Sequence, residues 1–330
     1  NSDLDFLGHL AGLRSYYKPK SNFTLSFRDV LIRNDDPLQF DPSNPGQYYL
    51  STAASRNTYI RNIAEPQIQY RFGPDNHLGL LYRNNYFNVD DRDDSDGTEH
   101  AINPRLLYWF DIRNGVLIDY SYTRTEMKES SDWTGNDVRS RYTYRFSPIT
   151  SVFGEFYFGN RLFDPPSVNY NIYSPSIGIE HAFSPNLLAL VRAGYLEMRP
   201  KSGETHDSPV LNLGITKRTE LSTYSLMIES GFREDYLSPE NLGYAEYKRV
   251  EAAFSHRILS RLAMSISASA ERAEFTINDI EEDIYTLSAR LSWNPFKGLF
   301  IAPALFYRNV DSTTNDYWVF RGYLTATLTH

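Results

Sequence analysis

The sequence of 330 residues contains no cysteine, so disulfide bonds and thiolate metal sites are excluded. It has no run of apolar residues near the ~18–20 that a membrane-spanning helix needs. It also lacks a Pro/Ser-rich linker, a shift in composition or a block of charge that would divide it, so we expect one domain over residues 1–330. No signal peptide begins at Asn1, and we expect a mature, trimmed chain.

Motifs for catalysis, cofactors and nucleic acids are missing as well. The sequence has no Gly-x-Ser-x-Gly motif, no evident Ser/His/Asp grouping, no phosphate loop and no dinucleotide glycine pattern. The seven histidines show no metal-ligand spacing, and the net charge of −8 opposes nucleic-acid binding. We therefore expect neither an enzyme nor a cofactor site.

An acidic stretch at 90–97, DDRDDSDG, is the weak exception to the absence of metal motifs. Its aspartates Asp91, Asp93 and Asp96 could hold a loose divalent cation. Asp96 occupies the place of the turn glycine of an EF-hand, and no glutamate follows at the twelfth position. A solvated loop is the favoured interpretation.

Aromatic residues are abundant, with 25 tyrosines and 20 phenylalanines, and they recur at corners of similar sequence. Phe146-Ser147-Pro148 is echoed about 37 positions later by Phe183-Ser184-Pro185. A fixed spacing indicates a repeated supersecondary unit. Polar and apolar residues alternate on both sides of each corner, which is the period of a strand with two unlike faces.

The alternation predicts strands in pairs joined by tight turns. The segments are 6–17 and 23–32, 59–72 and 78–87, 102–112 and 116–125, 138–146 and 152–160, 170–183 and 187–198, 210–216 and 221–232, 244–258 and 262–273, 284–293 and 300–310, and finally 317–329. Asn114-Gly115 is a strong hairpin dipeptide. The remaining connections are longer and polar. Short turns at one end and long loops at the other are typical of an outer-membrane barrel, so we predict an all-β, antiparallel, up-and-down transmembrane β-barrel.

The count of segments is seventeen, whereas single-chain bacterial barrels normally have an even number of strands. Closure matters because lipid cannot satisfy an unpaired strand edge. A further strand before Asn1 would make eighteen, which we favour within a range of 16–18 strands. Sixteen strands follow if residues 6–17 do not form part of the wall.

The last segment shows the two faces clearly, because Gly322, Leu324, Ala326 and Leu328 alternate with polar residues. In an outer-membrane barrel the apolar face points to lipid and the polar face to a wet lumen. Aromatic residues near the turns then form the belt at the membrane interface. The candidates for this belt are Phe72, Phe146, Phe183 and Trp293.

The same alternation predicts the residues that line the pore. The basic ones are Arg28, Arg71, Arg83, Arg105, Arg139, Arg141, Arg145, Arg192, Arg249, Arg257, Arg290, Arg308 and Arg321. The acidic ones are Asp111, Asp119, Glu155, Glu180, Glu229, Glu251 and Glu271, and most remaining acid is expected in loops such as 90–97 and 280–283. An arginine-rich wall attracts anions. The alternative is a ladder of cross-strand ion pairs that stiffens the wall without selecting a solute.

Residues 2–28, SDLDFLGHLAGLRSYYKPKSNFTLSFR, and the YRFSP and HAFSP corners resemble the second β-barrel porin family of bacteria, a group often linked to exopolysaccharide export. The resemblance implies an outer-membrane pore in a Gram-negative bacterium, and passage of a secreted polysaccharide. It also implies periplasmic export partners and a strand upstream of Ser2 and Asp3. It supplies no catalytic residue.

We therefore expect a pore for hydrophilic solute, either a secreted polysaccharide or small anions. Two alternatives remain open. The barrel could be a structural sheath around a partner such as an electron-transfer cytochrome, or it could be an outer-membrane hydrolase. The long segment 35–57 is the best candidate for a constriction folded into the pore, and a plain surface loop is an equal alternative.

Overall fold

A computed structural model describes residues 9–34, 39–40, 48–49, 58–90, 92–235, 243–276, 280–313 and 316–328. Within these ranges the regular structure consists of β-strands, and no helix is long and apolar enough to cross a membrane.

The strands are long, most of them between 12 and 18 residues. They are β1 (His9–Lys20), β2 (Phe23–Asn34), β3 (Gln39–Phe40), β4 (Tyr48–Tyr49), β5 (Tyr59–Arg71), β6 (His77–Val89), β7 (Arg92–Trp109), β8 (Asn114–Met127), β9 (Trp133–Ser147), β10 (Thr150–Phe163), β11 (Tyr170–Ser184), β12 (Leu187–Pro200), β13 (His206–Arg218), β14 (Ser222–Asp235), β15 (Gly243–Leu259), β16 (Leu262–Phe275), β17 (Ile280–Phe296), β18 (Leu299–Ser312) and β19 (Tyr317–Leu328).

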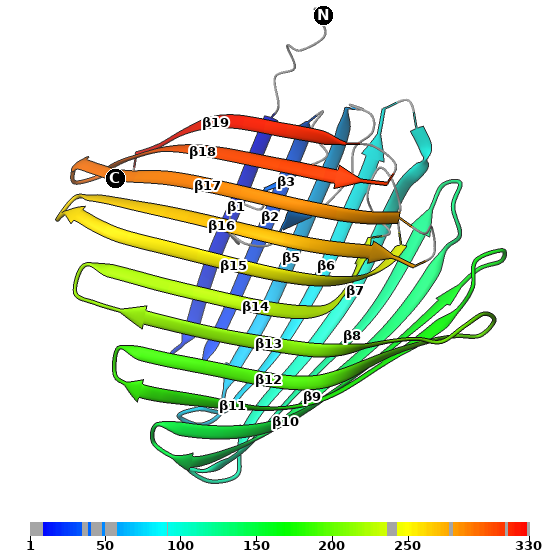
Figure 1. Cartoon of the computed structure of the whole chain (residues 1–330), viewed down its shortest axis with the longest axis horizontal. Coiled ribbons are helices and arrows are strands. Elements are labelled where there is room, and N and C mark those ends of the chain that lie inside the picture. The colour runs from blue at the N-terminus through cyan, green and yellow to red at the C-terminus, as the bar shows by residue number, and fades with distance from the viewer. Residues whose placement is uncertain are drawn as a thin grey trace, which may run out of the picture.

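All strands except β3 and β4 form one curved sheet of 17 strands, in which each strand pairs antiparallel with the next (Figure 1). The two short strands β3 and β4 pair with each other. In the described part of the chain, no pairing joins β1 to β19. The predicted all-β, up-and-down architecture and its range of 16–18 strands are confirmed.

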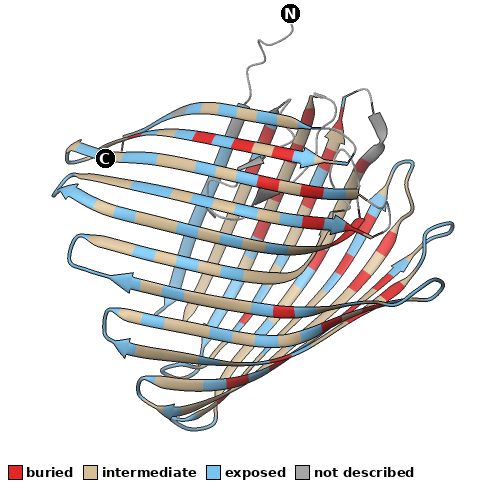
Figure 2. Ribbon diagram, in the orientation of Figure 1, coloured by how far each residue is buried: buried red, intermediate tan, exposed pale blue. Residues whose placement is uncertain are grey.

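The two faces of the sheet differ as the alternation predicts. On β14, Tyr224, Leu226 and Ile228 are exposed, whereas the residues between them are partly covered. Exposed large apolar residues recur in this way on nearly every strand of the sheet. Burial of the other face increases toward the strand ends that carry the long loops (Figure 2). In water such an exterior would be a large aggregation-prone surface, whereas hydrocarbon solvates it.

The turn between β7 and β8 corrects one expectation. The Asn-Gly pair does not form the turn, because Asn114 and Gly115 already pair with β9 as the start of β8. Instead, the carboxylate of Asp111 accepts hydrogen bonds from the backbone N–H groups of Arg113 (2.7 Å) and Asn114 (2.8 Å). These bonds lower the pKa of Asp111 below its ordinary value and stabilise the turn. Asp111 is therefore a turn residue and not part of the pore wall.

The strands also extend further at their long-loop ends than the sequence indicates. Residues 90–97 and 280–283, both expected as loops, lie largely in strand, since β7 begins at Arg92 and β17 at Ile280. The predicted segments 102–112 and 284–293 match the ~9–11 residues that cross a bilayer, whereas β7 has 18 residues and β17 has 17.

Leu226 tests which solvent surrounds the barrel. We expect Leu226→Arg to lower the free energy of unfolding by about 2–4 kcal/mol, because the side chain would enter the middle of the apolar band. Urea unfolding of the protein folded into phosphatidylcholine vesicles measures this loss. The neighbouring substitution Ser225→Arg points to the inner face and should cost less than about 1 kcal/mol. Equal losses in both variants would mean that the two faces see the same medium.

Candidate functional site: a charged, partly occluded lumen

Side chains on the inner face of the curved sheet contact one another between strands that are far apart in the sheet. Arg161 on β10, for example, reaches Glu234 on β14. The thirteen arginines of the predicted pore wall all lie on strands of this sheet. At least eight of them have a carboxylate within 4.0 Å, namely Arg28, Arg83, Arg105, Arg139, Arg141, Arg145, Arg192 and Arg249.

Two glutamates each bridge a pair of these arginines. Glu65 accepts Arg28 at 3.2 Å and Arg83 at 2.8 Å, from the strands on either side of it. Glu155 accepts Arg139 at 2.9 Å and Arg192 at 2.8 Å, with only 5% of its side chain exposed. The guanidinium groups therefore approach one another around a shared acceptor, an arrangement that cross-strand charge pairing stabilises.

The other predicted acids are paired in the same way. Asp119 lies 3.2 Å from Arg105, and Glu180 lies 2.5 Å from Arg141. Glu229 and Glu251 lie 2.7 and 3.6 Å from Arg249. Glu271 pairs with Arg233, an arginine that the sequence analysis did not include. Much of the inner wall is thus a ladder of compensated charges.

Four predicted arginines, Arg71, Arg257, Arg290 and Arg308, have no carboxylate within 4.0 Å among the described residues. Arg71 ends β5, and Arg257 and Arg290 lie toward the ends of β15 and β17 that carry tight turns. The guanidinium of Arg290 instead lies 5.7 Å from the centre of the Phe300 ring. The exposed arginines among these four therefore lie toward the turn end. Arg308 on β18 is only 1% exposed, and the remaining predicted arginine, Arg321, lies on β19.

The four predicted belt residues share one kind of position. Phe72, Phe146, Phe183 and Trp293 are all exposed near tight turns.

Of the predicted metal site, Asp96 is buried and accepts hydrogen bonds from the Val89 backbone (2.7 Å) and the Asn88 side chain (2.6 Å). Asp91 and the side chain of Asp93 lie outside the described residues. No group of three or more His, Cys, Asp or Glu in the described ranges is placed to hold a metal ion.

A polar hollow of about 320 Å³ lies along the inner wall of β5 to β9. Its lining includes Gln69, His77, Arg105, Asp119 and Arg139. Amide, imidazole, guanidinium and carboxylate groups line this part of the wall, so it is suited to hold water and hydrophilic solute.

The lumen is narrowed at the loop end by part of β14 and β15. β13 pairs with β12 up to His206, but it pairs with β14 only as far as Asn212 and Glu229. Beyond that point β14 bends away from β13 toward β15 (Figure 1). We call residues 230–235 and 243–245 the strap. The segment 35–57, the predicted constriction, lies almost entirely outside the described residues.

The sequence at the split explains why the strands separate there. Pro209 on β13 has no N–H to donate, which suits it to an unpaired strand edge. The Ser230 hydroxyl replaces the missing backbone partners, since it accepts from the Leu211 N–H at 2.9 Å and donates to the Pro209 carbonyl at 2.8 Å. Both backbone groups therefore stay satisfied at the edge of the apolar band.

The strap turns one face of the β14–β15 ladder into the lumen. Phe232 and Tyr244 have the alternation of the lipid-facing residues lower on the same strands, yet Tyr244 is fully buried. Their rings pack on Tyr157 and Tyr170, and Tyr244 also joins a cluster with Ile172 on the inner wall of β11. The opposite face of the strap is also covered, because Arg233 pairs there with Glu271.

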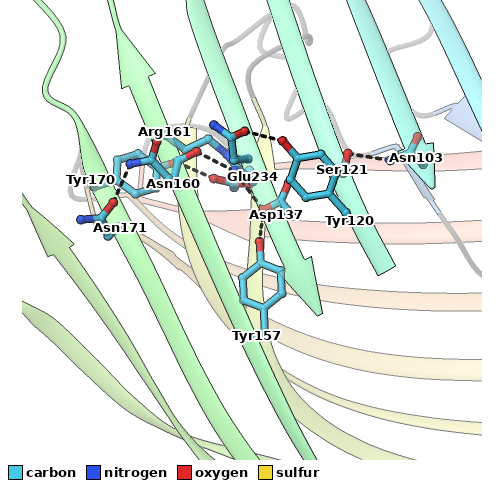
Figure 3. A network of polar contacts seen from close by, with 11 residues as sticks. Asn103, Tyr120, Ser121, Asp137, Tyr157, Asn160, Arg161, Tyr170, Asn171 and Glu234 are labelled. Atoms are coloured by element: carbon cyan, nitrogen blue, oxygen red, sulfur yellow. Dashed lines mark hydrogen bonds and ion pairs between the residues drawn. The ribbon is translucent and has the colours of Figure 1, made fainter. Parts of the chain in front are cut away.

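One partly buried carboxylate, that of Glu234, joins the strap to the opposite wall (Figure 3). Glu234 accepts Arg161 at 2.5 Å and the Tyr170 hydroxyl at 2.5 Å. Arg161 is only 5% exposed, and Asp137 lies 3.0 Å away on its other side. Tyr157 donates its hydroxyl proton to the same Asp137.

The sequence analysis missed Asp137, Arg161 and Glu234 for two reasons. Asp137 and Arg161 share the alternation of Arg139 and Glu155, but each lies one residue beyond a predicted strand end. Correctly placed ends would have included both. Glu234 has the alternation of the lipid face, so no pattern in the sequence indicates that it points inward.

No protein-family model matches the chain, and no curated protein matches it. Solved structures match nearly all of it. The copper transporter OprC is 8% identical over 98% of this chain, with a TM-score of 0.57. The FrpB iron transporter from Neisseria meningitidis (F3-3 variant) is 11% identical over 92% of this chain, with a TM-score of 0.56. The siderophore receptor PiuA from Acinetobacter baumannii is 10% identical over 92% of this chain, with a TM-score of 0.53.

The chain spans 64%, 60% and 62% of the length of these three structures. At identities this low, the likeness to these structures shows a shared fold and nothing more. Together with the apolar exterior and polar interior, the likeness defines the class of this protein: it is an outer-membrane β-barrel of the Gram-negative type. The predicted fold class and location are confirmed.

Glu155 tests the ladder of charges. We expect Glu155→Gln to lower the free energy of unfolding in detergent by about 2–3 kcal/mol, because two arginines lose a shared and nearly buried acceptor. Glu126→Gln is the matched control, since Glu126 and its partner Arg124 are each more than half exposed. That change should cost less than about 1 kcal/mol. A loss at Glu155 no larger than the control would show that the wall does not depend on the ladder.

Proposed function

We propose that this barrel passes hydrophilic solute across the outer membrane and performs no chemistry on it. The observation that carries the proposal is the inner wall, which is lined with paired charges and amides from β2 to β17 and includes the polar hollow. Water-filled lumens of barrels are lined by polar and charged residues in this way.

Small anions are the solutes that the charges favour. Most wall arginines are compensated by acids, so the ladder alone gives little selectivity. The three exposed arginines without an acidic partner among the described residues, Arg71, Arg257 and Arg290, lie toward the turn end, where they would attract anions. Passage of a secreted polysaccharide, which the family resemblance implies, remains a further proposal that these residues do not single out.

The other candidates receive less support. A sheath needs room for a partner, and the strap with its aromatic cluster narrows the loop end of the lumen. The similar structures OprC and FrpB are named as a copper transporter and an iron transporter. We do not extend either metal to this chain, because it has no cysteine and its described residues form no metal-ligand cluster.

Reversal potentials in planar bilayers under a KCl gradient test this function. We expect conductance with a preference for chloride over potassium. Replacing Arg71, Arg257 and Arg290 together by glutamine should lower that preference by at least about twofold, because the uncompensated charge is lost.

Arg124→Gln provides the matched control, since Arg124 lies on the outer face of β8 near its loop end and pairs with Glu126. Its selectivity should equal that of the unchanged protein. A preference for potassium in the unchanged barrel would contradict the proposed anion selectivity. A barrel that folds and inserts but never conducts would contradict the passage itself.

A further inference from the structure

We propose that the strap is a releasable gate, held against the inner wall of β10 and β11 by the carboxylate of Glu234. The inference rests on the proposed passage through the lumen and assigns its regulation to one carboxylate. Three features of the described structure carry it.

The first feature is the way the strap is attached. Its hydrogen-bonded ladder continues into the wall on one side, where Ala245 pairs with Phe275 of β16. Toward β13 the ladder stops at Glu229. The strap can therefore move with the β15 side as its fixed edge, and Ser230 lies where it leaves the wall. At the base of the strap, the Ser230 hydroxyl caps the Leu211 N–H and the Pro209 carbonyl of β13.

The second feature is the kind of contact between the strap and β10 and β11. Phe232 packs on Tyr157 and Tyr244 on Tyr170, with ring centres 5.3 and 6.0 Å apart. The polar contacts include those of Glu234 with Arg161 and Tyr170. Every one of these contacts is made by side chains, so the strap can leave without breaking the sheet.

The third feature is the state in which release leaves the wall. Arg161 keeps Asp137 at 3.0 Å when Glu234 leaves, so its buried charge retains a partner. A buried cation with no remaining acceptor would oppose opening strongly. A second carboxylate on the fixed side lowers that cost, as a reversible latch requires.

Thiol labelling tests the movement without relying on transport. The chain has no cysteine, so a single Ile172→Cys reports on the wall under the strap, where Ile172 has no exposed surface. We expect a membrane-impermeant maleimide to react with this cysteine at least about tenfold faster when Glu234→Gln is added, because a charged hydrogen bond to the strap is lost. Tyr170→Phe, which removes one hydroxyl bond to Glu234, should accelerate the reaction by a smaller factor.

Glu180→Gln is the matched control. Glu180 also pairs with a wall arginine at 2.5 Å, but neither partner belongs to the strap. The Glu180→Gln change should leave the labelling rate of the Ile172→Cys variant unchanged. Ser121→Cys, in the polar hollow, should react at one rate in every background, which checks that the reagent reaches the lumen. Unshifted migration of the folded band on unheated gels confirms that each variant folds. If Glu234→Gln does not fold, Tyr170→Phe is compared with Glu180→Gln instead.

Equal labelling rates at position 172 in the Glu234→Gln and Glu180→Gln backgrounds would overturn the gate. Bilayer recordings separate this failure from that of the proposed function. A barrel that conducts steadily and identically in all variants retains the passage and loses the gate. Faster labelling with no conductance in any variant retains the moving strap and loses the passage.

Discussion

The structure depends on one constraint, which is that hydrocarbon offers no partner to a backbone N–H or C=O group. A long antiparallel meander satisfies these groups strand by strand, and the side chains then have to suit lipid on one face and water on the other. The split beside β14 shows how far the constraint reaches. Where the ladder ends, Pro209 has no N–H to satisfy, and the Ser230 hydroxyl donates to the Pro209 carbonyl and accepts from the Leu211 N–H.

The same constraint shapes the chemistry of the lumen. Because the outer face carries the apolar residues, the charged residues of each strand are directed inward, where they lie at strand spacing. Glu65 and Glu155 each join two arginines in this way, so the wall is both hydrated and largely neutralised. Under the proposed function, the charge left uncompensated would then decide which ions enter. The strap is an exception to this division of faces. There, residues with the alternation of the lipid-facing side pack against the inner wall.

The fold was predictable to a large extent, because the period of two is imposed by the two solvents and is therefore visible in the residues. The structure differs from the prediction at positions where the two solvents do not determine the conformation. Asp111 forms the turn that Asn114-Gly115 was expected to form, since its carboxylate binds two backbone N–H groups. Strand ends were placed too early because strands continue past the bilayer, which hid Asp137 and Arg161. The inward position of Glu234 depends on β14 leaving β13, a tertiary event that the alternation of residues does not record.

The central claim is that lipid outside and water inside meet on opposite faces of each strand. Spin labels placed singly at positions 264–270 of β16 test it most directly, in the protein reconstituted into lipid vesicles. Collisions with oxygen should be frequent at positions 264, 266, 268 and 270, and collisions with a water-soluble nickel chelate should be frequent at 265, 267 and 269. Nickel accessibility that is equally high at both sets, or that shows no alternation, would contradict the account.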